Sequence, residues 1–183
     1  MDVFEAIKGR RSVRSFTQGQ QVAEDVVKRI LEAGRWAPSW ANSQCVRYVL
    51  VRDRKRIEQL AATMPERNPA HPAFKTCAFV LAVVAKHGLA GYKKGQKIEE
   101  RDWYMFDAGC AVQNVCLAIH ALGLGTVIVG LFDWRRANEV LNVPEGYETI
   151  CLLPVGYPEK QPPAPPRRSL DELLSHETFS PDE

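Results

Sequence analysis

The chain has 183 residues, of which 45% are hydrophobic and 25% charged, with 24 Lys and Arg against 22 Asp and Glu. This length and balance predict a single ordinary globular domain over residues 1–183, and the formal net charge of +2 argues against a dedicated nucleic-acid binder. A domain of this size buries a limited share of its surface, so we expect any deep cofactor site to draw on a second subunit.

The start of the chain lacks the pattern of a secretory signal, and no apolar run approaches the roughly 20 residues that a membrane-spanning helix needs. The five cysteines include no Cys-x-x-Cys pair, and the four histidines lie far apart, without metal-ligand spacing. We therefore expect a cytoplasmic protein with no disulfide, no bound metal and no membrane contact.

In the first third of the chain, segments with a clear helix or strand pattern alternate with residues that interrupt secondary structure. Asp2 and Glu5 predict a capped helix that ends near Gly9. Apolar residues at helical spacing predict a second helix over 22–31, and Val46–Val51 has the pattern of a strand.

The central third is dominated by two apolar segments. Lys55–Met64 predicts a helix, the proline-containing Pro65–Pro72 a loop, and the β-branched run Thr76–Val84 a buried central strand. Lys86–Arg101 is polar and glycine-punctuated, which favours a mobile flap. The longest helix is predicted over 102–122, and its apolar residues cover more than one face, so we expect it in the core or at a subunit interface.

The last third ends in an unusual arm. Thr126–Leu131 and Thr149–Val155 predict strands, and Asp133 is placed to cap a helix that runs to Leu141. Pro158–Pro166 holds five prolines, which favours an extended arm, and a short helix is predicted over 169–174. Helices and strands mix without a regular βαβ rhythm, which indicates an α+β fold around one central sheet.

Two arginine-rich clusters, far apart in sequence, suit phosphate binding, because a guanidinium group donates in parallel to two oxygens and stays charged. Their alternative interpretation is two solvated basic surfaces. The clusters comprise Arg10, Arg11, Ser12 and Arg14 near the start, and Arg167 and Arg168 after the proline arm.

The loop over residues 38–44 concentrates amide and hydroxyl groups that can match the edge of a planar heterocycle, because an amide offers both donor and acceptor. An ordinary turn that satisfies its own backbone is the alternative. The sequence holds no fingerprint for dinucleotide binding, no phosphate-binding loop and no nucleophile arrangement. Any redox or transfer chemistry would therefore come from a bound cofactor.

Motifs across nearly the whole chain resemble, in order, those of the flavin-dependent nitroreductase family. They are Arg10-Arg11-Ser12-Val13-Arg14-Ser-Phe, Ala37-Pro-Ser-Trp-Ala-Asn-Ser-Gln, Asp107-Ala-Gly-Cys-Ala-Val-Gln-Asn, Leu122-Gly-Leu-Gly-Thr, Val129-Gly130, Leu153-Pro-Val-Gly-Tyr-Pro and Arg167-Arg168-Ser-Leu-Asp-Glu-Leu. The resemblance implies a mostly antiparallel sheet flanked by helices in an intertwined homodimer. It also implies a shared site for FMN and hydride transfer from NADH or NADPH to a small electron-poor acceptor, such as a nitroaromatic or a quinone.

The resemblance also assigns cofactor-binding roles. The phosphate and ribityl chain would fall to Arg10, Arg11, Ser12 and either Arg167 or Arg168, and the flavin ring to Arg14, Pro38, Ser39, Asn42, Gln44, Val129 and Gly130. Trp103 and Tyr104 could form part of a lid or belong to the core. No catalytic side chain is implied, since the flavin carries the chemistry.

One departure from the family pattern is Cys45-Val46, where many members have Pro-Trp. We expect Cys45 to be a small packing residue. A reductive dehalogenase, a flavin-fragmenting enzyme of the same fold and a non-catalytic flavin-binding redox protein remain as alternative functions.

Overall fold

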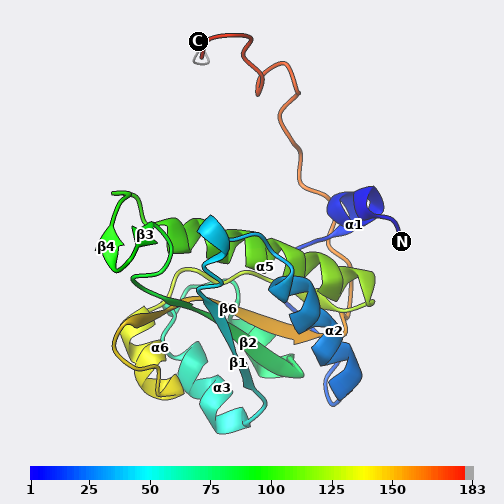
Figure 1. The fold of residues 1–183 in the computed structure, drawn as a ribbon. Helices are drawn as coiled ribbons and strands as arrows, with labels where there is room; N and C mark the ends of the chain where they lie inside the picture. Colours follow the sequence, from blue (N-terminus) through cyan, green and yellow to red (C-terminus); the bar gives the residue numbers. More distant parts are fainter. Residues whose placement is uncertain (180–183) are drawn as a thin grey trace.

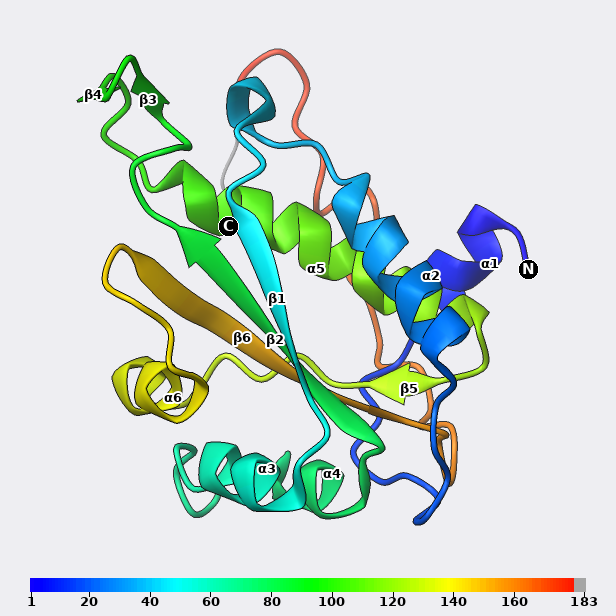
Figure 2. The same ribbon diagram turned by 60° about the horizontal axis from the view of Figure 1, so that its bottom comes forward.

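The computed structural model describes residues 1–179 and centres on a four-stranded antiparallel sheet in the order β1-β2-β6-β5. Helices cover both faces of this sheet, with α2 and α5 on one side and α3, α4 and α6 on the other (Figures 1 and 2). The strands are β1 (Val46–Val51), β2 (Phe79–Lys86), β5 (Gly125–Thr126) and β6 (Tyr147–Gly156). The predicted α+β class and the central antiparallel sheet are confirmed.

The central strand β2 contributes side chains to the hydrophobic packing on both faces of the sheet, because successive side chains of a strand point in opposite directions. Phe79, Leu81 and Val83 join the hydrophobic cluster under α2 and α5, whereas Val80 and Ala82 join the cluster under α3 and α4. A strand buried on both faces needs apolar residues at every position, which explains the uninterrupted apolar run in the sequence.

The first cluster packs α2 (Glu24–Arg35) and α5 (Trp103–Ala121) against the sheet. Ile30 from α2 and Val115 and Ile119 from α5 are buried there. None of the helices within residues 1–179 is long and apolar enough to cross a membrane.

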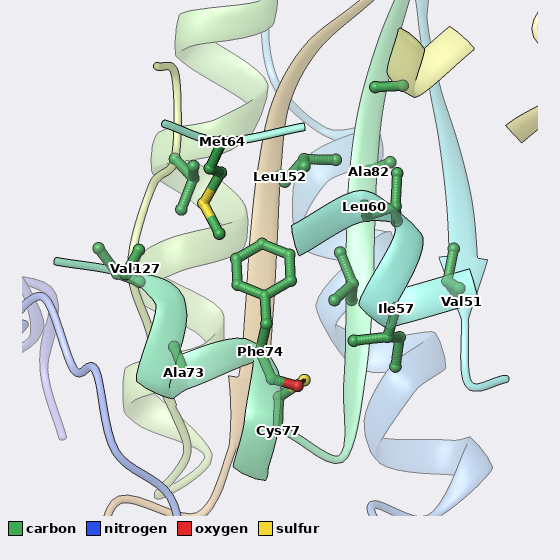
Figure 3. Packing of buried hydrophobic residues seen from close by; sticks show 14 of the residues in the cluster. Val51, Ile57, Leu60, Met64, Ala73, Phe74, Cys77, Ala82, Val127 and Leu152 are labelled. Atoms are coloured by element: carbon green, nitrogen blue, oxygen red, sulfur yellow. Dashed lines mark hydrogen bonds between the residues drawn. The ribbon is translucent and has the colours of Figure 1, made fainter. Parts of the chain in front are cut away.

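The second cluster lies under α3 (Arg54–Ala61), α4 (His71–Thr76) and α6 (Trp134–Leu141). The ring of Phe74, from α4, lies among Leu60, Met64 and Leu152 in this cluster (Figure 3). Asp133 caps α6, as predicted, by accepting hydrogen bonds from the backbone amides of Arg135 and Arg136.

Two smaller elements lie outside these layers. Helix α1 (Val3–Gly9) begins with the predicted capping box of Asp2 and Glu5. Between β2 and α5 the predicted flap forms a hairpin of two short strands, β3 (Tyr92–Lys93) and β4 (Gln96–Lys97).

Four predicted elements need correction. The predicted loop Pro65–Pro72 runs into α4, because Pro72 sits in the first turn of that helix, where its missing N–H costs nothing. Consequently the strand predicted from Thr76 begins only at Phe79. The strand predicted over 126–131 is reduced to β5 and a single bridge between Val129 and Leu152.

The last correction concerns the C-terminal arm, which leaves the body beside α1 and extends away from it (Figure 1). Gln161 Nε2 donates to the carbonyl oxygen of Gly9, after which the arm has no helix or strand up to residue 169. The helix predicted over 169–174 is wrong. Ser169 and Glu172 form the reciprocal bonds of a capping box, but only a turn follows.

Candidate functional site

The polar loop before β1 has an unusual backbone. Ala41, Asn42 and Gln44 all have left-handed conformations, with φ of 45°, 54° and 46°. Such a conformation costs an L-residue about 1–2 kcal/mol, so other contacts must maintain it. One of these contacts is within the loop, where the amide of Gln44 donates to Ser39 Oγ at 3.0 Å.

The other contacts converge on Asp107, in the first half of α5. Asp107 Oδ1 accepts a hydrogen bond from the backbone amide of Trp40 at 2.9 Å. Its Oδ2 accepts from Ser43 Oγ at 3.0 Å and from Cys45 Sγ at 3.4 Å. The loop is therefore anchored to α5 at both of its ends. Cys45 is fully buried beside Asp107, which fits its expected role as a small packing residue.

The predicted phosphate segment at residues 10–14 lies beside the strand that follows α5. The amide of Val13 donates to the carbonyl of Thr126 at 2.9 Å, and Ser12 forms a parallel bridge with Thr126. Gly125 must lack a side chain here, because a Cβ would come within 2.9 Å of Val13 Cβ. These contacts place the segment at residues 10–14 beside Gly125 and Thr126, a few residues before the predicted Val129 and Gly130.

Arg10 and Arg11 produce a positive potential at the C-terminal end of α5. Burial, followed by the charges of Arg10 and Arg11, lowers the pKa of His120. Arg11 Nη1 also donates to the carbonyl oxygens of Lys8 and Arg10, so Arg11 caps the end of α1 as well.

Val129 and Gly130 follow along the edge of β6. Val129 exchanges two backbone hydrogen bonds with Leu152, both of 3.0 Å, and its side chain is buried. A Cβ at Gly130 would meet nothing within 4 Å, so the backbone at this position is open to close approach by a planar ligand. Just before them, the buried Thr126 Oγ1 has no hydrogen-bond partner within residues 1–179.

Trp103 and Tyr104 lie at the base of the hairpin. Tyr104 Oη donates to Glu148 of β6 at 3.4 Å, and the Trp103 ring packs edge-on against Phe106 with ring centroids 5.4 Å apart. A Cβ at Gly91 would lie 3.6 Å from the Trp103 ring, so this side chain supports the hairpin from below. Both residues therefore pack where the hairpin joins α5.

Arg167 and Arg168 belong to the C-terminal arm, which extends away from the body of the protein (Figure 1). Arg167 Nη1 donates to the carbonyl of Pro166 within the arm. Within residues 1–179 of one chain, the arm therefore leads away from the segment at residues 10–14.

The polar loop and the phosphate segment are also separated within one chain. Asp107 anchors the loop, while Arg10 acts electrostatically on Cys116 and His120. At a rise of 1.5 Å per residue, Asp107 and Cys116 are about 14 Å apart along the axis of α5. One chain therefore presents two half-sites at different positions along this helix.

A cavity of about 640 Å³ adjoins the polar loop, between α2, β1 and α5. Pro38, Ser39, Gln44 and Asp107 contribute to its wall. This volume lies within the usual range for sites that bind small molecules and cofactors. Four charged residues also line the cavity, namely Lys28, Glu32, Arg35 and Arg47.

The residues of the phosphate segment fit the chemistry of FMN. Two guanidinium groups close enough to lower the pKa of the same histidine, with the Ser12 hydroxyl nearby in sequence, suit a phosphate of charge near −2. The unpartnered Thr126 hydroxyl and the open backbone at Gly130 add a polar group and room for a flat ring.

Asp107 is the residue that the sequence interpretation missed as part of the site. It appeared only as the first residue of a motif in an apolar helix. The signal was a single carboxylate among the hydrophobic side chains of α5, which has to be hydrogen-bonded if it is buried.

Comparisons with known proteins agree with this geometry. Residues 7–157 match the model of the Nitroreductase family. A protein of Methanothermobacter thermautotrophicus, assigned as an NADH dehydrogenase/NAD(P)H nitroreductase, is 31% identical over 88% of this chain and 80% of its own length. The FMN reductase (NAD(P)H) of Bacillus subtilis is 30% identical over 97% of this chain and 74% of its own length.

A solved structure shows the same fold with a ligand. A protein of Desulfovibrio desulfuricans, assigned as a nitroreductase and solved in complex with FMN, superimposes with a TM-score of 0.79. It is 31% identical to this chain, and the superposition covers 98% of this chain and 99% of the other.

Proposed function

The chain belongs to the nitroreductase family, and we propose that it is an FMN-dependent NAD(P)H oxidoreductase that acts on small electron-poor acceptors. The observation that carries the proposal is the pairing of the basic segment at 10–14 with the segment at 125–130 through Val13 and Thr126. Groups suited to a phosphate thus lie beside a backbone open to a flat ring, as FMN requires. The match to the FMN-bound Desulfovibrio protein supports the choice of cofactor.

When bound, FMN supplies hydride transfer between the nicotinamide and the acceptor. Arg10 and Ser12 would hold the phosphate through charge-assisted hydrogen bonds, and Arg11, Arg167 or Arg168 would add a further cation. Arg14, which is exposed, would supply a cation for the pyrimidine edge of the ring, where negative charge on a reduced flavin would be stabilised.

The polar loop orients the ring. Ser39, Asn42 and Gln44 offer donors and acceptors that match the edge of a flavin, and Pro38 packs beside them. Gly130 presents its backbone without a Cβ in the way. No side chain needs to act as an acid or base in the transfer itself, so the protein's role is to bind, orient and exclude competing reactions.

We propose further that two chains form one site in a cytoplasmic homodimer. The supporting observation is the separation along α5 between the loop anchored by Asp107 and the phosphate segment near His120. A partner chain would supply the missing half-site, and the extended arm beyond residue 158 would contribute to the contact between the two chains. Met105 and Phe106 are 47% and 63% exposed near the start of α5, as expected of a face that another chain covers.

Anaerobic mixing of the FMN-loaded protein with NADH, and separately with NADPH, tests the proposed reaction. We expect loss of the visible absorbance of the flavin with at least one nicotinamide, and its return on addition of a nitroaromatic or a quinone. Free FMN at the same concentration is the control. If neither nicotinamide bleaches the bound flavin, the chain is a flavin-holding protein without turnover. A preparation that takes up no FMN would contradict the proposal entirely.

A further inference from the structure

The carboxylate of Asp107 is 2% exposed and is surrounded by donors from a single loop. The donors are the Trp40 amide, the Ser43 hydroxyl and the Cys45 thiol, at 2.9, 3.0 and 3.4 Å. Burial of a carboxylate costs free energy unless the group is paired with a positive charge or fully hydrogen-bonded. None of the ion pairs within residues 1–179 involves Asp107, so these donors are what stabilise its charge.

The donors belong to the segment with the unusual backbone. Trp40 precedes the left-handed residues Ala41 and Asn42, and Ser43 and Cys45 flank the left-handed Gln44. Burial first, and then the Asp107 charge, raise the pKa of Cys45 to about 11, so its thiol keeps the proton that it donates. The carboxylate therefore ties the two ends of the loop together while the loop itself turns outward.

Two of the loop residues assigned to the flavin face outward. Asn42 and Gln44 are exposed, whereas Asp107 lies behind them and its side chain reaches only the inner residues. We propose that Asp107 is a positioning residue: its buried carboxylate holds residues 39–45 in the conformation that presents Ser39, Asn42 and Gln44 to the flavin. This inference rests on the proposed function, since it takes the flavin as the ligand of the loop.

The isosteric substitution Asp107→Asn tests the proposal. The new amide keeps an acceptor for Trp40 but turns a donor toward Ser43 and Cys45, which are donors themselves. Ser43→Ala removes one contact and leaves the charge in place, so it remains informative if Asp107→Asn fails to fold. Asp53→Asn is the matched control, because Asp53 also accepts from a backbone amide, that of Arg56, at the start of α3.

Three measurements read out the result: hydrogen exchange of residues 39–45 in the protein without flavin, the dissociation constant for FMN, and the visible circular dichroism of bound flavin at saturating FMN. For Asp107→Asn we expect faster exchange in the loop, FMN binding weakened at least about tenfold, and an altered dichroism band. Ser43→Ala should change all three in the same direction but less. Asp53→Asn should leave all three unchanged. A general loss of stability would not alter the dichroism of flavin at saturation.

Two outcomes would overturn the inference while leaving the proposed function intact. Unchanged exchange in Asp107→Asn would show that the carboxylate does not hold the loop. Faster exchange with FMN affinity within about twofold of wild type, and an unchanged dichroism band, would show that the loop does not serve the flavin. A wild-type protein that binds no FMN would overturn the proposed function, and the positioning role with it.

Discussion

The rings of His87 and Tyr104 pack against each other at a tilt of 42°, with their centroids 4.8 Å apart, and both side chains contact the carboxylate of Glu148 on β6. His87 Nε2 lies 3.3 Å from this carboxylate and Tyr104 Oη lies 3.4 Å from it. His87 follows β2 and Tyr104 is in the first turn of α5, so this contact closes the base of the intervening hairpin. This contact, together with the hydrogen bond from the His87 amide to the carbonyl oxygen of Gly146, attaches the base of the hairpin to the sheet.

Glu148→Ala should loosen the hairpin without unfolding the protein. The two bonds are long and partly exposed, so we expect a loss of about 1 kcal/mol or less in the free energy of unfolding. Hydrogen exchange over residues 87–103 should nevertheless rise clearly. Glu145→Ala, an exposed position close in sequence, is the control and should change neither quantity. Unaltered exchange in the Glu148 variant would mean that the hairpin is held elsewhere.

Arg10→Ala should weaken the binding of FMN. A hydrogen bond to a charged group contributes about 1.5–3 kcal/mol, so we expect a dissociation constant about 10- to 100-fold higher, measured by fluorescence titration. The difference from wild type should shrink as salt is added, because the lost interaction is largely electrostatic. Arg29→Ala, on the exposed face of α2, removes the same charge and should leave the affinity unchanged. Equal affinities for the two variants would remove Arg10 from the phosphate site.

Gly34→Ala should destabilise the packing of α2 on β1. A Cβ at this position would collide with Tyr48 Oη and come within 2.8 Å of Val115 Cγ2. We expect a loss of about 1–3 kcal/mol, as for other overpacked positions, measured by urea unfolding. Gly109→Ala is the control in a helix, because a Cβ there meets nothing within 4 Å.

Tyr48→Phe should partly rescue Gly34→Ala. The Tyr48 hydroxyl is the atom nearest to the new Cβ, and it is buried without a hydrogen-bond partner in the described part of the chain. Its removal should therefore be close to neutral or stabilising by itself. The Val115 contact remains, so the rescue should be incomplete. Strictly additive effects in the double variant would contradict this account of the collision.

The features that the sequence predicted well are local ones. The caps at Asp2 and Asp133 depend on residues within one helical turn, and the apolar run of β2 follows from burial on both faces. The family motifs added the pairing of distant segments, which periodicity alone does not reveal. Helix α4 was missed because Pro72 at a helix start has the same composition signal as a proline in a loop.

The interactions that sequence reasoning missed join residues far apart in the chain. Asp107 contacts Trp40 across 67 positions, and Tyr104 contacts Glu148 across 44. The residues next to Asp107 and Tyr104 in sequence do not indicate which distant residue each of them contacts. An aromatic residue at the end of a glycine-rich segment suits a lid or the core equally well, and the partner of the Tyr104 hydroxyl lies on β6, far away in sequence.

His120 should make the stability of the flavin-free protein depend on pH. Burial, then Arg10 and Arg11, lower the pKa of His120 in the folded protein below its ordinary value near 6.5. Below pH 6.5 this histidine is protonated in the unfolded chain, whereas His120 in the folded protein stays mostly neutral until the pH reaches its lower pKa. The unfolded chain therefore binds more protons in this range, and the free energy of unfolding falls as the pH decreases toward the folded pKa. Urea unfolding between about pH 7.5 and about pH 5.5 measures this slope.

His120→Asn should flatten this slope, whereas His176→Asn, at an exposed position on the arm, should leave it as in wild type. A cavity effect could shift the stability of the His120 variant at every pH, so the comparison is between slopes and not between absolute values. Bound FMN should also flatten the slope in wild type, because a phosphate beside Arg10 and Arg11 offsets the charges that oppose protonation of His120. If the His120 variant kept the wild-type slope, the acid sensitivity would have to come from other groups, and the positive potential at this end of α5 would be weaker than inferred.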